Sequence, residues 1–333
     1  MRAVYAEHGQ LVHKDVPEPS AGPGQLLVAV KAAGLNAADR LMLEGSHASG
    51  ATVRPAARVA PASLPLGMEA AGEVLAVGEG VEEFSIGDGV MGICIGAFAP
   101  LAVIQAAFAM RVPDRLQWTE AAAVPAVFST AHDALVTAGR LTTGDHVLVT
   151  AASSGVGVAA LQLARLLGAG TVAASSRSPD KLDQLATSGV PWDVGLVTGE
   201  SDFVERGLQA TDDHGFDIIV DSVGAAAVHE NIGVGALGGR IISVGRMSGH
   251  RAEIDLEELA RKRLSLIGVT FRTRSLSEIA DAHRRAAADV VPALADGRLR
   301  VVLDRVYPFE DAGAAQEWMR TGRRIGKVVL ELH

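Results

Sequence analysis

The sequence predicts an α/β protein in which a doubly wound parallel-sheet domain is joined to a β-rich domain. Between residues 123 and 267, near-continuous apolar strands alternate with helical segments, as in a parallel sheet covered on both faces. The first 120 residues instead carry short strands separated by Pro-Gly and Gly-Asp turn signals. Because the chain has 333 residues, both ends must fold outside the central region. We therefore expect one domain from residues 1–122 with 268–333, and a second from 123–267.

The N-terminal strands are expected at residues 25–33, 72–77 and 87–92. Residues 89–110 carry no charge and are numerous enough to span a bilayer in principle. Two glycines, a proline and a glutamine interrupt this run, which favours buried strands joined by a turn. Residues 48–63 are expected to form a loop.

The central region begins with a strand at 146–150, the turn TAASSGVG at 150–157 and an apolar helix at 158–167. Small residues at such a turn let backbone N–H groups approach a pyrophosphate at a helix N-terminus. The turn keeps the last glycine of the G-x-G-x-x-G pattern, so by itself it is a weak signal. The expected phosphate contacts are Ser153, Ser154, Gly155 and Val156.

The second strand, at 171–176, bears on the choice of cofactor. An acidic residue at its end would bind the adenosine ribose of NAD, and none is present. Ser175, Ser176, Arg177 and Lys181 are there instead, a set suited to a 2′-phosphate. The sequence thus favours NADPH, with the alternative that Arg177 and Lys181 are solvated residues at a helix start.

The βα pattern continues to residue 270 and the tail then returns to helix. The further strands are expected at 192–197, 216–221, 238–245 and 264–270, and the helices at 200–210 and 225–236. Ligands meet the carboxyl ends of such strands, so Val223, Val244 and Gly245 should lie along the ribose and nicotinamide. The tail is expected to form helices at 276–295 and 310–321 and a strand at 327–332, and to pack back on the N-terminal domain.

Composition narrows the setting of the protein. With 48% hydrophobic and 21% charged residues, the chain is expected to be a globular protein with an ample core. The formal charge of -9 argues against a nucleic-acid partner. One cysteine, Cys94, excludes an intramolecular disulfide, and its apolar neighbours suggest a buried thiol. Residues 1–8 lack the apolar segment of a signal peptide, so a cytoplasmic location is expected, with no membrane partner.

Several motifs together resemble the zinc-independent quinone oxidoreductase branch of the medium-chain dehydrogenase/reductase superfamily. They are GLNAAD at 34–39, LGMEAAG at 66–72, FSIGDGVMG at 84–92, EAAAVP at 120–125, STAH at 129–132, the 150–157 turn, DSVG at 221–224 and GKVVL at 326–330. The resemblance covers nearly the whole chain. It implies a GroES-like catalytic domain made from both chain ends, a central Rossmann domain and a cofactor cleft between them. It also implies a homodimer that pairs the last Rossmann strand, here near 264–270.

The resemblance also bears on the metal. Zinc-dependent relatives hold a catalytic zinc with Cys, His and Cys at positions that match Asn36, Met68 and Ala126, which are not a usable ligand set. Without a Lewis acid, a better substrate is a small molecule that stabilises its own anion, such as a quinone or an α,β-unsaturated carbonyl compound. We therefore expect an NADPH-dependent reductase with no metal. Asn36 is expected beside the nicotinamide, with local backbone satisfaction of its amide as the alternative.

The proton donor is less defined. Enoyl-reducing relatives place a tyrosine shortly after the Asn motif, where this chain has Leu41 and His47. His47 is a candidate donor, although its place at the start of the expected 48–63 loop favours a solvated histidine. His132 replaces another frequent tyrosine and either faces the cofactor or caps the following helix. Family positions further suggest three cofactor contacts: Thr130, Phe271 and Lys327.

Two other functions remain open at this point. The first is an enoyl-thioester or specialised-metabolite enone reductase. The second is a non-catalytic NADPH-binding protein, which the missing tyrosine and the altered turn support. The short-chain dehydrogenase class fails, because neither Tyr5 nor Tyr307 is followed by the lysine of a Tyr-x-x-x-Lys pair.

Overall fold

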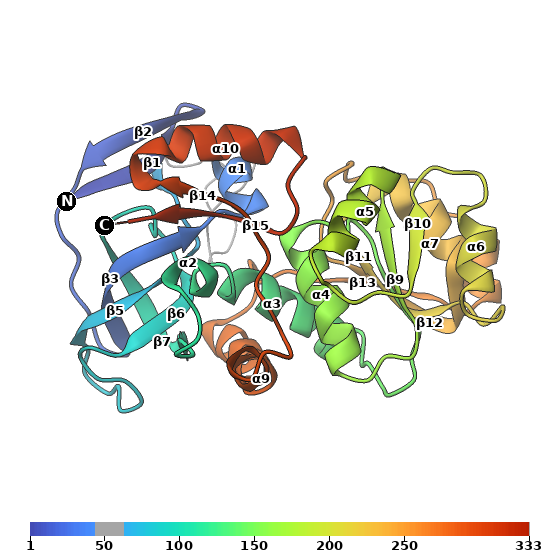
Figure 1. The fold of residues 1–333 in the computed structure, drawn as a ribbon, viewed down its shortest axis with the longest axis horizontal. Helices are drawn as coiled ribbons and strands as arrows, with labels where there is room; N and C mark the ends of the chain where they lie inside the picture. Colours follow the sequence, from blue (N-terminus) through green and yellow to red (C-terminus); the bar gives the residue numbers. More distant parts are fainter. Residues whose placement is uncertain (44–62, 333) are drawn as a thin grey trace. The chain divides into compact units, whose positions relative to one another are not determined.

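The computed structural model describes residues 1–43 and 63–332. It divides into two compact units, the first formed by Met1–Ser129 with Phe271–His333 and the second by Thr130–Thr270 (Figure 1). The first unit therefore contains both chain ends, and the second is one continuous segment.

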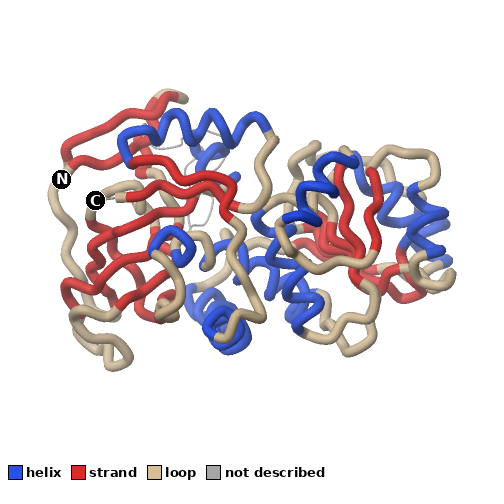
Figure 2. Tube along the Cα trace, in the orientation of Figure 1, coloured by secondary structure: helices blue, strands red, loops and turns tan. Residues whose placement is uncertain are grey.

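The first unit is dominated by strands (Figure 2). Its strands are β1 (Arg2–Glu7), β2 (Gln10–Asp15), β3 (Gln25–Gly34), β4 (Ser63–Pro65), β5 (Glu69–Val77), β6 (Gly89–Cys94), β7 (Leu101–Arg111), β14 (Leu303–Pro308) and β15 (Lys327–Glu331). One sheet has the order β14-β15-β3-β5-β6-β7, and β3 also pairs with β7. Strands β3, β5, β6 and β7 therefore close on themselves as a small barrel, while β2-β1-β4 forms a separate three-stranded sheet.

The C-terminal strand completes the first unit. Strand β15 pairs antiparallel with β3, with Val329 opposite Gly34 and Leu330 opposite Ala33. Residues alternate along β3 between buried and half-buried, as expected of a strand with one face on a core. The pairing places the start of β15 beside the segment that follows β3.

Four helices of different lengths accompany these strands in the described part of the first unit. They are α1 (Ala37–Leu43), α2 (Trp118–Ala121), α9 (Leu276–Ala295) and α10 (Ala312–Thr321), with a 3₁₀ turn, η3, at Phe309–Asp311. Helix α9 begins at a capping box, in which Ser275 and Glu278 satisfy each other's backbone N–H groups. Helix α3 (Pro125–His132) runs across the boundary between the two units.

The second unit is a doubly wound fold. Its sheet has the order β10-β9-β8-β11-β12-β13, and every pairing is parallel. The strands are β8 (Val147–Val149), β9 (Val172–Ser176), β10 (Val194–Val197), β11 (Phe216–Asp221), β12 (Gly235–Ser243) and β13 (Ser265–Gly268). The strand order reverses between β8 and β11, which is where ligands meet such sheets.

The helices of this unit are α4 (Gly155–Leu166), α5 (Pro179–Thr187), α6 (Phe203–Gln209), α7 (Val228–Val234) and α8 (Leu256–Arg261), with a π-helical turn, η1, at Asp133–Ala138 and a 3₁₀ turn, η2, at Ala225–Ala227. Helix α4 starts directly after the turn because Ser154 caps it, its hydroxyl accepting from the N–H of Gly157 at 3.1 Å. A Cβ on Gly157 would lie 2.5 Å from the carbonyl oxygen of Ala151, so this glycine permits the close turn.

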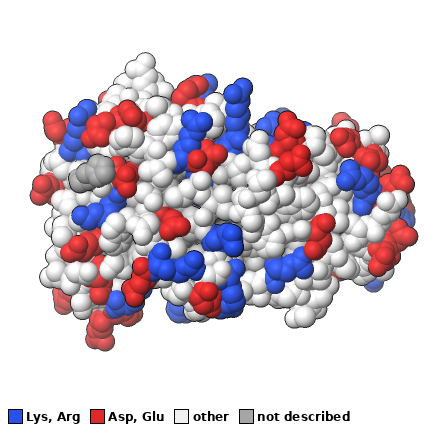
Figure 3. All heavy atoms as spheres, in the orientation of Figure 1, with Lys and Arg blue, Asp and Glu red and all other residues white. Residues whose placement is uncertain are grey.

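The α/β fold class expected from the sequence is confirmed, with local corrections. The helix expected near 225–236 is a 3₁₀ turn followed by the shorter α7, and its last residues open β12 instead. Strands β1, β2, β4 and β14 were not predicted. Strand β4 has three residues, and charged residues lie within or at the ends of the other three strands. No helix among the described residues is long and apolar enough to cross a membrane. On the face drawn in Figure 3, acidic and basic side chains are interspersed.

Candidate functional site

The dinucleotide turn of the second unit has the geometry of a phosphate site. Gly155 and Val156 occupy the first turn of α4, where backbone N–H groups have no intrahelical acceptor. Ser153 and Ser154 precede them, with Ser153 buried and Ser154 half-buried. The N-terminus of a twelve-residue helix adds a positive partial charge. The turn can therefore bind a pyrophosphate through backbone donors.

The end of β9 carries the side chains that were expected around a 2′-phosphate. The hydroxyl oxygens of Ser175 and Thr198 lie 2.7 Å apart, and Ser176 is buried. Arg177 is exposed, whereas the Lys181 ammonium lies 3.5 Å from the Ser153 hydroxyl oxygen, at the phosphate turn. The structure thus places Lys181 against the phosphate turn, whereas the sequence had grouped it with Ser175, Ser176 and Arg177.

Strands β8 and β11 are tied together at their carboxyl ends. Thr150 donates its hydroxyl to Asp221 Oδ1 at 2.9 Å, and the same carboxylate accepts from the N–H groups of Val223 and Gly224. This buried carboxylate fixes the loop that was expected to lie along the ribose. Beside it, a Cβ on Gly245 would lie 2.6 Å from the carbonyl oxygen of Ser222. The loop that follows β12 therefore needs a residue without a side chain at position 245.

The first unit holds a buried charge network around Asn36. The Lys327 ammonium donates to Glu69 Oε1 at 2.6 Å, to Asn36 Oδ1 at 2.9 Å and to the carbonyl oxygen of Leu35 at 2.6 Å. Asn36 Nδ2 donates to Glu69 Oε1 at 2.8 Å, and the N–H of Ala126 donates to Glu69 Oε2 at 2.8 Å. Glu69 is fully buried and Lys327 is 5% exposed. Each charge is therefore paired and hydrogen-bonded, as buried ions require.

A second buried acid fixes the backbone of the same region. Asp39 accepts from the N–H of Asn36 at 2.7 Å and from the N–H of Gly67 at 3.1 Å. It thereby joins the segment after β3 to the segment before β5. Burial raises the pKa of Asp39 to about 7.

The three positions that match zinc ligands in the relatives come together around Glu69. Asn36 and Ala126 both hydrogen-bond its carboxylate, and Met68 is its neighbour in the chain. Amide, thioether and methyl side chains do not supply the donors that zinc needs. The described residues contain no group of three His, Cys, Asp or Glu arranged for a metal ion. Cys94 is buried as expected, which raises the pKa of its thiol to about 12.

The remaining residues that the sequence suggested for the site lie outside the charge network of Asn36, Glu69 and Lys327 or outside the described residues. Phe271 stacks on the His283 ring, with centroids 5.6 Å apart, and the Ser129 hydroxyl oxygen lies 2.8 Å from His283 Nδ1. His132 is buried at the N-cap of η1, and its side chain makes no capping hydrogen bond there. Thr130 is half-buried in α3. His47 and residues 48–62 lie outside the described residues.

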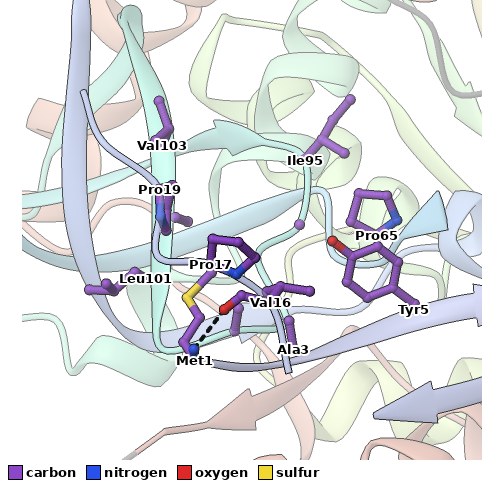
Figure 4. Close-up of a pocket in the computed structure, with 13 residues that line it drawn as sticks. Met1, Ala3, Tyr5, Val16, Pro17, Pro19, Pro65, Ile95, Leu101 and Val103 are labelled. Carbon is purple, nitrogen blue, oxygen red and sulfur yellow. Dashed lines mark hydrogen bonds between the residues drawn. The ribbon is translucent and has the colours of Figure 1, made fainter. Parts of the chain in front are cut away.

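Tyr5 lines a different cavity of the first unit (Figure 4). This cavity has a volume of about 350 Å³ and a mainly apolar wall that includes Pro17, Pro65, Ile95 and Leu101. None of the residues in the charge network lines it. Tyr5 is thus not grouped with Asn36.

Sequence reasoning missed Glu69 and Asp39 beside Asn36 in the first unit, and Asp221 at the strand ends of the second unit. Each is an acid inside or next to an apolar strand or helix, and that placement was the available signal. A carboxylate in an apolar run is costly unless it has partners, so it deserved the same scrutiny as Asn36.

Comparisons with known proteins agree with this architecture. The family model described as an alcohol dehydrogenase GroES-like domain matches residues 22–114, and one described as a zinc-binding dehydrogenase matches residues 194–330. A solved NAD-dependent alcohol dehydrogenase is 30% identical, with a TM-score of 0.85 and coverage of 100% of both chains. The chain belongs to the medium-chain dehydrogenase/reductase superfamily. The resemblance seen in the motifs is confirmed at this level.

Other solved structures similar to this chain include an NADPH complex and a quinone oxidoreductase. A mycobacterial protein solved in complex with NADPH is 27% identical, with a TM-score of 0.85 over 100% of both chains. A quinone oxidoreductase of Pseudomonas syringae pv. tomato is 26% identical, with a TM-score of 0.84 over 99% of both chains.

The curated relatives are much longer proteins. The polyketide synthase GfsB of Streptomyces halstedii is 35% identical over 308 residues, which are 92% of this chain and 5% of the synthase. The erythronolide synthase EryA2 of Saccharopolyspora erythraea is 32% identical over 324 residues, 95% of this chain and 8% of that protein. The chain thus spans a small part of these relatives.

Proposed function

We propose that the protein is a zinc-independent, NADPH-dependent reductase that delivers a hydride to a quinone or an α,β-unsaturated carbonyl compound. The observation that carries this proposal is the Asn36 amide held between a buried ammonium and a buried carboxylate. This arrangement offers a hydrogen-bond donor where the zinc-dependent relatives place a Lewis acid. An amide N–H stabilises a negative charge less than a metal ion does, so it suits a hydride acceptor that stabilises its own anion.

The residues of the second unit fit NADPH. Gly155 and Val156 would hold the pyrophosphate through their backbone N–H groups, with Ser153 and Ser154 beside them. The 2′-phosphate would lie among Ser175, Ser176, Arg177 and Lys181. The glycine at position 157 gives the turn the closeness that backbone donors need. When bound, the cofactor supplies the hydride. The relative solved with NADPH supports the same choice.

In the reaction, the protein's own residues bind and orient the substrate and polarise its carbonyl group. Hydride addition to the β-carbon moves the C=C electron pair toward the carbonyl carbon and leaves a negative charge on the oxygen. A hydrogen bond from Asn36 lowers the free energy of that charge, and a solvent proton then completes the α-carbon. The same donor serves a quinone, whose oxygen takes the charge when the ring is reduced.

A direct assay tests the proposal. NADPH oxidation at 340 nm is followed with a chelator present, against quinones, simple enones and an enoyl thioester, with NADH in parallel. Turnover of one acceptor class with NADPH preferred supports the reductase. Tight NADPH binding without turnover of any acceptor contradicts it and favours a non-catalytic NADPH-binding protein.

The relatives favour a second candidate, an enoyl-thioester reductase. Polyketide synthases carry their growing chains as thioesters. This chain is similar to a segment of two such proteins, which makes up 5% of the length of one and 19% of the length of the other. An α,β-unsaturated thioester has the same electron sink as an enone, so the charge network suits it equally. A ratio of kcat/KM values that favours the enoyl thioester over matched enones would select this substrate class.

A further inference from the structure

The neighbours of Asn36 determine which way its side-chain amide points. Its oxygen accepts from the Lys327 ammonium at 2.9 Å, and its nitrogen donates to the Glu69 carboxylate at 2.8 Å. An ammonium can only donate and a carboxylate can only accept. A rotated amide would face donor against donor and acceptor against acceptor, so one orientation is enforced.

Lys327 itself has no spare proton to offer a substrate. Its three N–H donors are taken by Leu35, Asn36 and Glu69, and its side chain is 5% exposed. Glu69 likewise accepts from Lys327 and Asn36 with one oxygen and from Ala126 with the other. The pair can therefore influence a reaction through Asn36 and not by direct contact.

The second side-chain N–H of Asn36 has only a weak acceptor. Apart from its bond to Glu69, the Asn36 nitrogen donates to the carbonyl oxygen of Gly34 in a long hydrogen bond of 3.4 Å. The residue is half-buried, so a ligand can reach it. An oxygen atom of a bound molecule that approaches this N–H more closely can therefore replace Gly34 as its acceptor.

We propose that Glu69 and Lys327 are positioning residues that present this N–H of Asn36 to the acceptor's carbonyl or quinone oxygen. The proposal rests on the reductase function above and deepens it. Asn36 is the group that touches the substrate and donates without losing its proton. As a bound metal would, the ion pair holds together the segments that contain Asn36, Glu69 and Ala126.

The test removes the ion pair while keeping the fold. Glu69→Leu combined with Lys327→Met leaves no unpaired buried charge, and such apolar replacements are commonly tolerated. We expect this variant to melt near the wild-type temperature and to bind NADPH within about two-fold of the wild-type Kd. Its kcat should fall by about 100-fold, as on loss of an oxyanion donor, with little change in KM.

A cycle with Asn36→Ala shows whether the pair acts through Asn36. Because all three residues would serve one hydrogen bond, adding Asn36→Ala to the double variant should lower kcat no further. Asp281→Leu with Arg284→Met, an exposed ion pair on α9, is the matched control and should leave kcat unchanged. A double variant with wild-type kcat, or losses that multiply in the cycle, would overturn the proposal.

A readout independent of turnover separates this proposal from the reductase assignment. Side-chain amide signals in a ¹⁵N NMR spectrum are assigned to Asn36 by their loss in Asn36→Asp. Slow hydrogen exchange of this amide in the wild type and fast exchange in the double variant is the expected result, even if every acceptor in the assay fails. Equal exchange in both proteins would show that the pair does not fix the amide.

Discussion

At the scale of single residues, the cofactor prediction depends on the charges at the end of β9. Arg177→Ala should weaken NADPH binding by about ten-fold or more and leave NADH binding nearly unchanged, because its guanidinium would contact the 2′-phosphate alone. Fluorescence titration with both cofactors measures the difference. Arg206→Ala, at another exposed arginine of the second unit, is the control. Equal losses for NADPH and NADH would contradict the assignment.

Asp39 predicts a pH dependence of stability. Burial raises its pKa to about 7 from an ordinary value of 3.8, so between these values the folded protein keeps a proton that the unfolded chain has released. This contribution to the free energy of unfolding is complete below pH 4 and is lost as the pH rises through 7. Asp39→Asn cannot titrate. The unfolding free energy of the wild type relative to this variant should therefore fall by roughly 1 kcal/mol per pH unit across the window.

Chemical denaturation at several pH values measures that slope. Asparagine also leaves one of the two backbone N–H groups without its acceptor, which adds a constant offset of about 1–3 kcal/mol against the variant. The offset does not change with pH. Parallel stability curves for the two proteins would show that Asp39 is ionised throughout.

Part of the site could be predicted from single residues, and part could not. Asn36 and the serines of the turn lie in short motifs whose chemistry is local. Glu69 stands out only as an acid in an apolar strand. Its partner could not be predicted, because Lys327 is 258 positions away in the chain. Only the pairing of β15 with β3 brings the two charges together, and no periodicity in the sequence encodes that contact.

At the scale of elements, prediction succeeded where a segment carries its own boundaries. Helix α9 has the predicted limits, because Ser275 and Glu278 cap its start and apolar residues recur at helical spacing. Strand β14 was not predicted because Asp304 and Arg305 interrupt its run of apolar residues, as is common in a strand at the edge of a sheet. Helix α7 was overestimated, since Gly235 already belongs to a strand.

Strand β13 is the other edge element with a testable role. It is the last strand of its sheet, and Leu266 is 47% exposed on it. We propose that two copies of the chain pair through this strand as a homodimer. Leu266→Asp should then convert a particle of twice 34.4 kDa into one of 34.4 kDa, because like charges would face each other across the new pairing.

Light scattering after size exclusion reads the mass directly. Leu256→Asp, at an exposed leucine on α8, is the matched control and should leave the mass unchanged. A wild-type protein that is already a monomer at micromolar concentration, or a dimer that survives Leu266→Asp, would rule out this strand as the interface.

At the scale of the whole molecule, the metal question has a simple test. Because Asn36, Met68 and Ala126 replace a zinc ligand set, extended dialysis against EDTA should change neither the NADPH oxidation rate nor the melting temperature. Elemental analysis of the dialysed protein serves as the check that metal is absent. A loss of rate that added zinc restores would show a metal role that the described residues do not account for.

The contact between Asn36 and Lys327 spans 291 positions, and this has a consequence for synthesis on the ribosome. Translation proceeds from the N-terminus, so Glu69 emerges long before the ammonium that neutralises it. A chain released before residue 327 would have to bury an unpaired carboxylate, at a large cost in free energy. Truncated products are therefore expected to remain unfolded and open to proteases instead of accumulating as folded, inactive protein.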